Sequence, residues 1–546
     1  MKKVKRITIL AVILLLVGFI YYYIALPPIN IHAVGFWYFI ISVLVITTII
    51  SAVLSIIRTN HSFTKARSLN EIHIDRSAFK SKRFLILLGL TVTAIVIFVV
   101  GSILSSPIVN ASKYQKLINI SDRDFLDDIK EVSYNEIPIL DKDSASLLGS
   151  RKMGSMVEYV SQFEVSNAYT QINYNNSPVR VTPLDYGSFF KWISNRKEGI
   201  PAYIKIDMAT QNVECVKLSE GIKYSKSEPF NRNIHRYLRF HYPTYIFDNP
   251  SFEINDEGIP YWICPVKDYT IGLFGGETIS RVVLVNAVTG DLENYSVEDV
   301  PTWVDHVYSA DLLIQYYDYY GTLKHGYWNT VFSQKDCLQT SDGYNYIALD
   351  DDVWVYTGVT SVGGDKSNVG FVLMNQRTAE TRYYSISGAE EYSAMRSAEG
   401  QVQHLKYIAT FPLLLNINNE PTYFIALKDE AGLVKKYAMV NISKYQIVAI
   451  GDTVMECEKT YTNLLETSGI SVTESNDVLS VTGRISKIAE AVVDGNSHYY
   501  IMLEGTEVIY DVNVATYINI VKYDVGDSVT FTYQQAVDSN KVLSVE

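Results

Sequence analysis

Three long apolar runs near the N-terminus constrain the fold of this chain more than any other feature of its sequence. Residues 7–26, 36–57 and 84–104 contain no Asp, Glu, Lys, Arg or His over 20, 22 and 21 residues. About 20 apolar residues in a helix cross the roughly 30 Å hydrocarbon core of a bilayer. We therefore predict three transmembrane helices that form a membrane anchor over residues 1–106. Because the first run is long and two more follow it, we expect it to be retained rather than cleaved as a signal peptide.

The distribution of positive charge predicts the orientation of this anchor. Residues 1–83 contain eleven Lys and Arg but only two acids, and most of the cations lie before residue 7 or in the 58–83 loop. Cytoplasmic flanks of membrane spans are enriched in Lys and Arg. We therefore expect the N-terminus and the 58–83 loop to be cytoplasmic, and residues 107–546 to lie on the extracytoplasmic side of a plasma membrane.

The remainder of the chain is acidic. The formal net charge is −12 and the first 83 residues contribute about +9, so the rest carries about −21. Such a surface repels phosphate backbones, and we predict no nucleic-acid partner. Cys215, Cys264, Cys337 and Cys457 form no C-x-x-C pair, which argues against a zinc site and leaves open one or two disulfides.

Beyond residue 107, short runs of Val, Ile, Tyr, Thr and Phe separated by Gly, Pro, Asn and Asp predict strands. We expect an α+β fold in which a mostly antiparallel β ectodomain follows the membrane helices. The predicted divisions are a helical and mixed linker domain (107–198), a helix-plus-sheet module (199–300), a connecting helix and β-hairpins (301–387), a second helix-plus-sheet module (388–470) and a small β-barrel (476–546).

The ectodomain contains an internal repeat of two sequence patterns. The first is a turn ending in proline before an aromatic strand start, at 199–204 (GIPAYI), 258–263 (GIPYWI) and 419–424 (NEPTYF). The second is an apolar strand that closes on Asn or Asp before a tight turn, at 206–213, 285–292 and 440–447. Helices predicted at 231–242 and 389–405 precede two of these hairpin sets.

The segment RVVLVNAVTGDLENY at 281–295 resembles the hairpin of PepSY-type modules. The resemblance implies small helix-plus-sheet domains within 199–300 and 388–470. In that family such domains are associated with peptidase propeptides and regulation, or with extracytoplasmic interactions, and no catalytic residue is carried over.

Residues 476–546 form a succession of short predicted strands, with Gly526-Asp527 before the fourth. This arrangement resembles a small OB-fold barrel, which implies a module for oligonucleotides, oligosaccharides or protein partners. The strands are rich in acids, so we do not expect single-stranded nucleic acid as the ligand.

Two groups of charged residues are candidate binding sites. Asp350, Asp352 and Asp365 stand among glycine turns and could hold Ca²⁺ through oxygen ligands, although the EF-hand spacing is absent and a solvated acidic turn is the simpler interpretation. Arg232, Arg236 and Arg239 follow helical spacing and could bind an anion, or pair with the many acids of this domain.

An aromatic group that includes Tyr316, Tyr319 and Trp328 is a candidate interaction surface, because these rings combine apolar area with a polar atom. We found no catalytic motif and predict no cofactor. The sequence therefore favours a membrane-anchored extracytoplasmic protein that binds an envelope protein or peptide. The alternative is a cell-envelope enzyme, or its regulatory subunit, acting on peptide or glycan.

Overall fold

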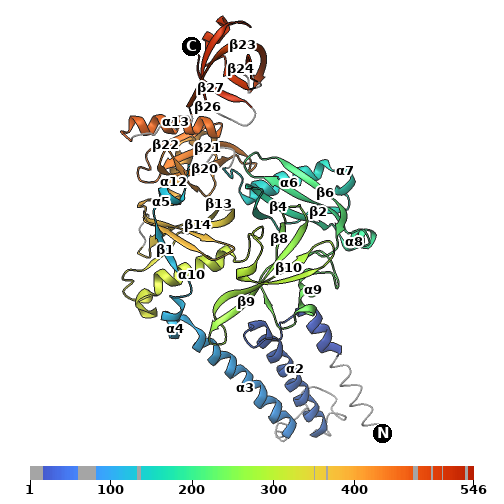
Figure 1. Cartoon of the computed structure of the whole chain (residues 1–546). Helices are drawn as coiled ribbons and strands as arrows, with labels where there is room; N and C mark the ends of the chain where they lie inside the picture. Colours follow the sequence, from blue (N-terminus) through green and yellow to red (C-terminus); the bar gives the residue numbers. More distant parts are fainter. Residues whose placement is uncertain are drawn as a thin grey trace. The chain divides into compact units, whose positions relative to one another are not determined.

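A computed structural model of the protein describes residues 16–59, 81–131, 137–349, 351–363, 367–470, 478–493, 496–506, 508–534 and 539–545. The chain forms two compact units, Met1–Ser468 and Gly469–Glu546. Unit 1 contains the apolar helices and a body of α+β structure that consists mainly of antiparallel sheets (Figure 1).

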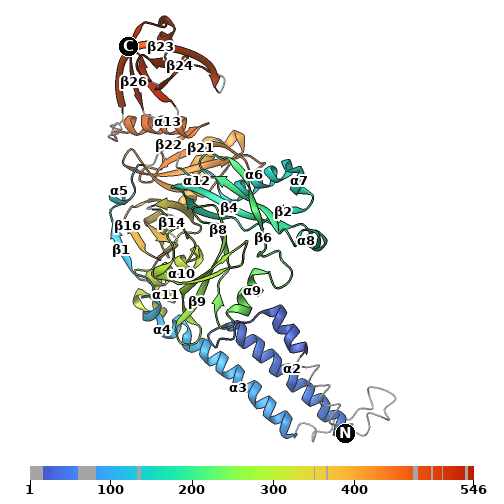
Figure 2. The same cartoon turned by 45° about the vertical axis from the view of Figure 1, so that its right-hand side comes forward.

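Two helices near the N-terminus are long and apolar enough to cross a membrane. They are α2 (Val34–Thr59), whose apolar part is Val34–Ile56, and α3 (Lys82–Ser105), and they pack side by side with a hydrogen bond of 3.1 Å between the hydroxyl groups of Thr48 and Thr91 (Figures 1 and 2). Only 6% and 17% of their most apolar windows are buried by the part of the chain that the structure describes, so most of their apolar side chains are uncovered there.

The first predicted span is described only in part. Residues Leu16–Ala25 form an apolar helix that is shorter than a span, and residues 7–15 lie outside the described residues. The positively charged loop predicted at 58–83 also lies largely outside them. The described residues therefore contain two candidate spans rather than three.

The body of unit 1 is built from four modules with the same connectivity. Each has a helix followed by five strands, which we call a to e in chain order. Module 1 contains α6 (Lys142–Ser155), β2 (Phe163–Val165), β3 (Thr170–Tyr174), β4 (Ser177–Tyr186), β5 (Ile200–Asp207) and β6 (Val213–Ile222). Module 2 contains α9 (Ile234–His241), β7 (Ile246–Phe247), β8 (Ser251–Ile254), β9 (Pro260–Ile271), β10 (Gly275–Asn286) and β11 (Leu292–Ser296).

Modules 3 and 4 repeat this order. Module 3 contains α10 (Ala310–Thr322), β12 (Leu338–Thr340), β13 (Asn345–Leu349), β14 (Asp352–Ser361), β15 (Ser367–Asn375) and β16 (Thr381–Tyr384). Module 4 contains α12 (Glu391–Gln401), β18 (Ile408–Ala409), β19 (Leu413–Ile417), β20 (Glu420–Lys428), β21 (Val434–Asn441) and β22 (Val448–Gly451). In every module, strands a and b both pair with c, c pairs with d, and d pairs with e. The sheet of module 3 gains β1 (Ile120–Arg123) and β17 (Gly388–Ala389) at its margins.

The turn between strands d and e is held by the same hydrogen bonds in all four modules. Its first residue is Asp or Asn, whose side chain accepts from backbone N–H groups two or three residues later: Asp207, Asn286, Asn375 and Asn441. The next residue donates its N–H to the start of strand c: Met208 to Pro178, Ala287 to Pro260, Gln376 to Val353 and Ile442 to Pro421, at 2.9–3.2 Å. Asn and Asp suit these turns because their side chains can bond to nearby backbone.

These equivalences correct the repeat inferred from sequence. Pro260 and Pro421 begin strand c, but Pro201 lies at the start of strand d, so the segment at 199–204 is not equivalent to the other two. Its true counterpart is Pro178 in β4. The third module has Val353 where the others have proline, and for that reason the sequence pattern did not include it.

The predicted boundaries at 199 and 301 also differ from the observed modules. The strand pair β4–β5 joins residues on the two sides of residue 199 in one sheet, and the predicted linker at 107–198 contains the first three strands of module 1. The segment at 301–387, predicted as a connection, holds most of module 3. Modules 2 and 3 share a core, in which Leu313 of α10 packs with Ile263, Leu284, Val355 and Val372 from the two sheets.

The remaining helices of unit 1 are α4 (Pro107–Tyr114), α5 (Phe125–Asp128), α7 (Val157–Val160), α8 (Phe189–Asn195), α11 (Tyr327–Val331) and α13 (Val454–Thr467). Unit 2 contains β23 (Val478–Val493), β24 (Asn496–Leu503), β25 (Ile509–Asn513), β26 (Ser528–Gln534) and β27 (Asn540–Val545). These five strands pair in a closed order, β23-β24-β25-β27-β26, around a core that includes Ile485, Ile501 and Phe531. The resemblance of this unit to the OB-fold stays a prediction.

The tip of the β9–β10 hairpin fastens the body of unit 1 to the end of α3. The buried Ser105 hydroxyl oxygen accepts from the backbone N–H groups of Leu273 and Phe274, at 2.8 and 3.1 Å. A side chain at Gly275 would put its Cβ 2.2 Å from the Ser105 carbonyl oxygen, so the backbone approaches closely there. The Phe274 ring packs against Phe98 of α3, with ring centroids 5.4 Å apart.

A second fastening joins α9 to the end of the helix Leu16–Ala25. The Arg239 side chain is 7% exposed and donates to the carbonyl oxygens of Leu26, Tyr242, Pro243 and Tyr245 at 2.6–3.3 Å. Burial lowers the pKa of Arg239 to about 10, so the guanidinium keeps its charge at neutral pH. We call these two fastenings together the junction.

Arg239→Met is expected to lower the free energy of unfolding by about 2–4 kcal/mol, because it leaves several carbonyl groups without their donor in a buried place. Thermal unfolding of the full-length protein in detergent would measure the change. Arg232→Met is the matched control, since among the described residues the Arg232 side chain makes one hydrogen bond, to the Arg196 carbonyl oxygen. Equal melting temperatures for the two variants would contradict this account of the junction.

Candidate functional site

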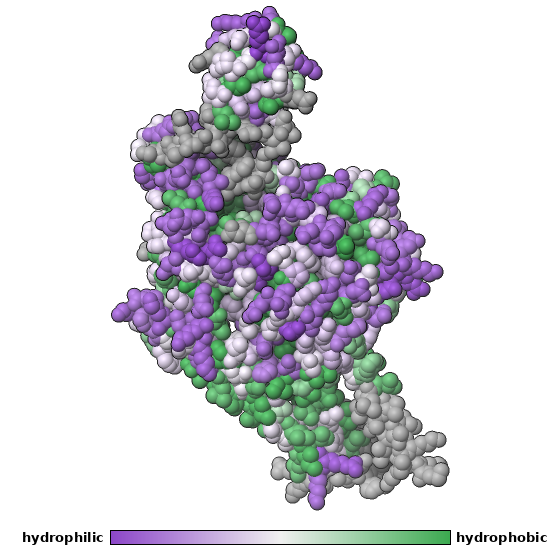
Figure 3. Space-filling view, viewed as in Figure 1, coloured by the Kyte–Doolittle hydropathy of each residue, from purple (hydrophilic) through white to green (hydrophobic). Residues whose placement is uncertain are grey.

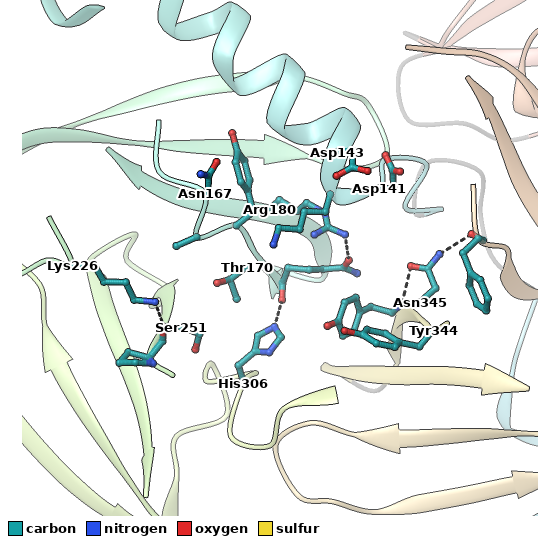
Figure 4. A pocket seen from close by; sticks show the side chains of 17 residues that line it. Asp141, Asp143, Asn167, Thr170, Arg180, Lys226, Ser251, His306, Tyr344 and Asn345 are labelled. Atoms are coloured by element: carbon teal, nitrogen blue, oxygen red, sulfur yellow. Dashed lines mark hydrogen bonds between the residues drawn. The ribbon is translucent and has the colours of Figure 1, made fainter. Parts of the chain in front are cut away.

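A cavity of about 480 Å³ lies where the four modules meet (Figure 4). Each module lines it with residues at or beside its connection between strands a and b: residues 167–171 in module 1, Pro250 and Ser251 in module 2, residues 344–346 in module 3 and Phe411 in module 4. Convergent loops on a rigid scaffold are a common place for binding sites. The size is within the range of small-molecule pockets.

Arg180 is the residue that distinguishes this cavity from an ordinary surface hollow. It lies on β4, is 5% exposed and lines the cavity, where Figure 4 shows it below Asp141 and Asp143. Its Nη2 donates to Gln171 Oε1 at 3.1 Å, and it forms no ion pair within the described ranges of the chain. Burial lowers the pKa of Arg180, but a guanidinium remains protonated at neutral pH.

Three buried polar groups of residues that line this cavity lack a partner among the residues that the structure describes: the Tyr169 hydroxyl, Nε of Arg180 and Nε2 of Gln171. Nε of Arg180 and Nε2 of Gln171 are the two nitrogen atoms among them. A buried polar group without a hydrogen bond costs free energy, and a buried charge costs more. Both atoms are donors, so a ligand that supplies acceptor oxygens would satisfy them, and a carboxylate would in addition neutralise the guanidinium.

Three other basic residues line the cavity: Lys142, which is exposed at the rim beside Asp143, and Lys226 and His306. The Lys226 ammonium donates to the Pro250 carbonyl oxygen at 2.8 Å, and burial lowers its pKa. His306 Nε2 donates to the Gln171 carbonyl oxygen at 2.9 Å, and burial lowers the pKa of its ring to about 4. The positive charge at neutral pH therefore comes from Arg180 and Lys226 within the cavity and from Lys142 at its rim, while His306 is neutral and holds the Gln171 backbone in place.

The rim of the cavity is acidic on one side and aromatic on another. Asp143 is exposed, whereas Asp141 caps α6 and pairs with Lys428. Burial opposes ionisation of Asp141, but the bonds from Lys428 and Ser144 outweigh it and hold its pKa below the ordinary value. Rings of Tyr344, Tyr346 and Phe411 supply apolar surface. The cavity thus offers cationic donors within, aromatic walls and one exposed carboxylate at its edge.

Beneath the cavity, two carboxyl groups are buried together. Glu253 of β8 accepts from the backbone N–H groups of Asp305 and His306, at 2.9 and 3.0 Å, and Asp305 accepts from the N–H of Asn173 at 2.7 Å. Burial raises the pKa of Glu253 to about 7, and burial together with the nearby Glu253 charge raises the pKa of Asp305 well above its ordinary value. This pair ties modules 1 and 2 to the segment that precedes module 3.

The predicted metal site is not assembled by the residues that can be placed. Asp350 and Asp365 lie outside the described residues. Asp352 is buried and accepts two hydrogen bonds from Arg377, at 2.6 and 2.8 Å, with a third from Asn375. Asp351 lies in the b–c connection of module 3 and has the positive φ that Asn175-Asn176 and Asn418-Asn419 show in the b–c turns of modules 1 and 4. Within the described chain, no group of three or more His, Cys, Asp or Glu could hold a metal ion.

The three candidate anion-binding arginines have other partners. Helix α9 begins at Ile234 with Asn233 as its N-cap, so Arg232 precedes the helix and does not share its face as the spacing predicted. Arg236 donates to the carbonyl oxygens of Tyr23, Pro229 and Phe230, and its guanidinium lies 4.3 Å from the centroid of the Tyr23 ring. Arg236 and Arg239 thus bind backbone at the junction instead of an anion or an acidic side chain.

The candidate aromatic group is divided by the fold. Tyr316 is buried and donates to the Glu277 carbonyl oxygen at 2.7 Å, so it is a core residue and offers no surface to a partner. Tyr319 is half-buried against Tyr114. Trp328 is 62% exposed and is the one member of the three that presents most of its surface to solvent.

All four cysteines are free.

The cavity residues were missed because their local sequence resembles an ordinary strand. Arg180 stands between Val179 and Val181, and this alternation predicts a half-buried strand with Arg180 facing solvent. In the structure residues 178–184 are all buried, because other modules cover the second face of the sheet. A sequence analysis that recognised all four modules could have predicted the cavity, because their a–b loops converge there.

Comparisons with known proteins do not identify a function for this site. No family model matches the chain, and no curated protein matches it. Among solved structures, a GH32 beta-fructofuranosidase from Bombyx mori aligns with 73% of this chain and 69% of its own chain, at 9% identity and a TM-score of 0.16. At that TM-score the alignment supports no inference about fold or activity.

The buried carboxyl pair should make the stability depend on pH. Both groups keep protons in the folded state at pH values where the unfolded chain has released them, so their contribution is most favourable below about pH 4 and is lost as the pH rises toward 7. Asp305→Asn removes one charge and is expected to flatten this decline by about 1–2 kcal/mol between pH 5 and pH 8. Denaturation at several pH values would measure it.

The exposed Asp256 provides the control, since Asp256→Asn makes the same chemical change away from the pair. A pH profile of Asp305→Asn identical to those of the wild type and Asp256→Asn would show that the pair does not share a proton.

Proposed function

We propose that the protein is a membrane-anchored binding protein, and that its four-module cavity takes a small carboxylate-bearing ligand of peptide type. The observation that carries the proposal is Arg180, a cation that is 5% exposed, lines the cavity and bonds to Gln171. Neither its Nε nor the Gln171 Nε2 has a partner among the described residues. Burying such a group without a partner lowers the free energy of unfolding. A ligand that completes its hydrogen bonds would explain why the group is buried there.

The shape and lining of the cavity favour a peptide-type ligand among carboxylates. Tyr344, Tyr346 and Phe411 provide apolar walls for a side chain, and Asp143 at the rim provides a partner for an amino group. A ligand with a carboxylate at one end and a cation at the other matches this distribution of charge. A short peptide has both groups, and a cavity of about 480 Å³ has room for one.

The membrane location is supported by α2 and α3, whose apolar side chains are mostly uncovered by the rest of the chain. Within this proposal the cationic N-terminus and the 58–83 loop face the cytoplasm and the body lies outside, as the charge distribution predicts. The PepSY-like character of the modules and the OB-like character of residues 476–546 fit an extracytoplasmic interaction protein and remain part of the proposal.

Binding of short peptides to the full-length protein in nanodiscs tests the proposal. Peptides with a free C-terminal carboxylate are expected to raise the melting temperature, and the same peptides with an amidated C-terminus should do so less. Arg180→Met should weaken binding by about 10–100-fold, because a charge-assisted pair is lost. Without ligand, this variant should be at least as stable as the wild type, since it removes a buried charge with one hydrogen bond.

Arg281→Met is the matched control. Arg281 lies on β10 outside the cavity, where its side chain bonds to Asn294, and its loss should leave peptide binding unchanged. Equal binding of free and amidated peptides, or equal binding by Arg180→Met and wild type, would refute the role assigned to Arg180.

A further inference from the structure

Five exposed apolar side chains lie beside the point where α3 ends. Ile108 and Val109 of α4 are 51% and 53% exposed, and Trp328, Val331 and Phe332 at α11 are 62%, 51% and 77% exposed. The rings of Trp328 and Phe332 stack on each other at 5.9 Å. We call these five residues the apolar edge. Soluble surfaces rarely gather so many large apolar side chains without a partner.

The apolar edge continues the uncovered surface of α3. Only Ser106 separates α3 from α4, and the Asn110 side chain ties the two helices by donating to the Leu104 carbonyl oxygen at 2.6 Å. Helix α4 in turn packs against α11. Ile103 and Leu104, in the last turn of α3, are themselves 56% and 57% exposed. Figure 3 shows hydrophobic residues gathered where the apolar helices meet the body.

The residues around the apolar edge suit a lipid headgroup layer. Lys113, Lys116, Lys324 and Lys335 are all exposed on the segments that carry or flank it. Lysines close to a membrane surface are attracted to anionic lipids, and Trp rings prefer the boundary between hydrocarbon and headgroups. Apolar side chains surrounded by exposed cations are the composition of an interfacial element.

From this arrangement we infer that the apolar edge is a lipid-binding surface, which inserts into the headgroup region of the leaflet at the Ser105 end of α3. The inference rests on the proposed membrane anchoring and adds a second contact with the bilayer, made by the body of unit 1. Trp328, Val331 and Phe332 would enter the interface while the nearby lysines contact anionic headgroups.

A second exposed apolar group on the same body provides an internal comparison. Phe189, Phe190 and Ile193 on α8 are 50%, 78% and 42% exposed, which is similar to the apolar edge. Figures 1 and 2 both place α8 away from the end of α3. If exposure alone attracted lipid, the two groups would behave alike, whereas the inference requires contact only at the apolar edge.

Photolabelling by lipid carrying a diazirine on its acyl chain tests the inference on the full-length protein. The protein would be reconstituted in vesicles of phosphatidylcholine with phosphatidylglycerol, irradiated and digested with trypsin. Cleavage after Lys and Arg releases residues 84–113, which contain α3, residues 325–335, which contain α11, and residues 181–191, which contain Phe189 and Phe190. We expect labelling of 84–113 and 325–335, and severalfold less labelling of 181–191.

The outcomes separate this inference from the proposed anchoring. Residues 84–113 also include Ile108 and Val109, so the segment 325–335 alone reports on the α11 part of the apolar edge. Labelling of 84–113 without 325–335 would overturn the inference, which requires lipid contact by Trp328, Val331 and Phe332, while leaving the anchor intact. Absence of label from 84–113 would overturn the anchoring and the inference together. Equal labelling of 325–335 and 181–191 would also overturn the inference, because lipid contact would then depend on exposure alone.

A double variant gives an independent check. Trp328→Ser with Phe332→Ser should reduce the label on its own tryptic segment severalfold, leave the label on 84–113 unchanged and preserve the melting temperature, since both side chains are exposed. The control Phe190→Ser should alter none of these signals. Unchanged labelling of the doubly substituted segment would refute the inference.

Discussion

The attachment of the β9–β10 hairpin and α9 to the ends of the apolar helices is the contact on which the rest of unit 1 depends. The Ser105 hydroxyl oxygen accepts hydrogen bonds from two backbone N–H groups of the hairpin tip, and the Arg239 side chain donates to four carbonyl oxygens, one of them that of Leu26. A long flexible tether would let the body move freely relative to the helices. Here the connection between α3 and α4 is one residue, and hydrogen bonds from distant parts of the chain fix it. These contacts fix module 2 against the helices, and module 3 builds on module 2 through a shared core.

The four-module arrangement explains where a ligand site can arise in a chain without catalytic motifs. A single module exposes its a–b loop on one side of a small sheet, and no one loop can enclose a ligand. Four equivalent loops meeting at one place enclose about 480 Å³ and bring Arg180 of module 1 close to residues of the other three. The buried pair Glu253 and Asp305 lies across the same meeting place, so the polar groups that join the modules and those that line the cavity form one region. The cavity is therefore a property of all four modules rather than of any one of them.

Sequence reasoning predicted the class of fold better than its organisation. The apolar runs at 36–57 and 84–104 correspond to α2 and α3, and the antiparallel hairpins at 285–292 and 440–447 lie where strands d and e meet. The repeat was only partly recognised, because proline marks strand c in three modules and Val353 replaces it in the third. The cavity could not be predicted, since the environment of Arg180 is set by modules far from it in the chain. Tyr316 and Asp352 were misread for the same reason: burial depends on what packs over a strand or helix, and local patterns do not contain that information.

The spacing of the junction contacts along the chain has a consequence for biogenesis. Leu26 and Arg239 are 213 residues apart, His32 and Leu273 are 241 apart, and Ser105 and Leu273 are 168 apart. A ribosome makes the apolar helices first, and a translocation machinery can insert them long before residues 236–274 have been synthesised. The ends of those helices therefore wait without their final partners while half of the chain is completed. Under the proposed anchoring, completion of the membrane-proximal layer therefore follows insertion of the helices, and a nascent chain that stalls before residue 239 lacks the contacts of Arg239 with their ends.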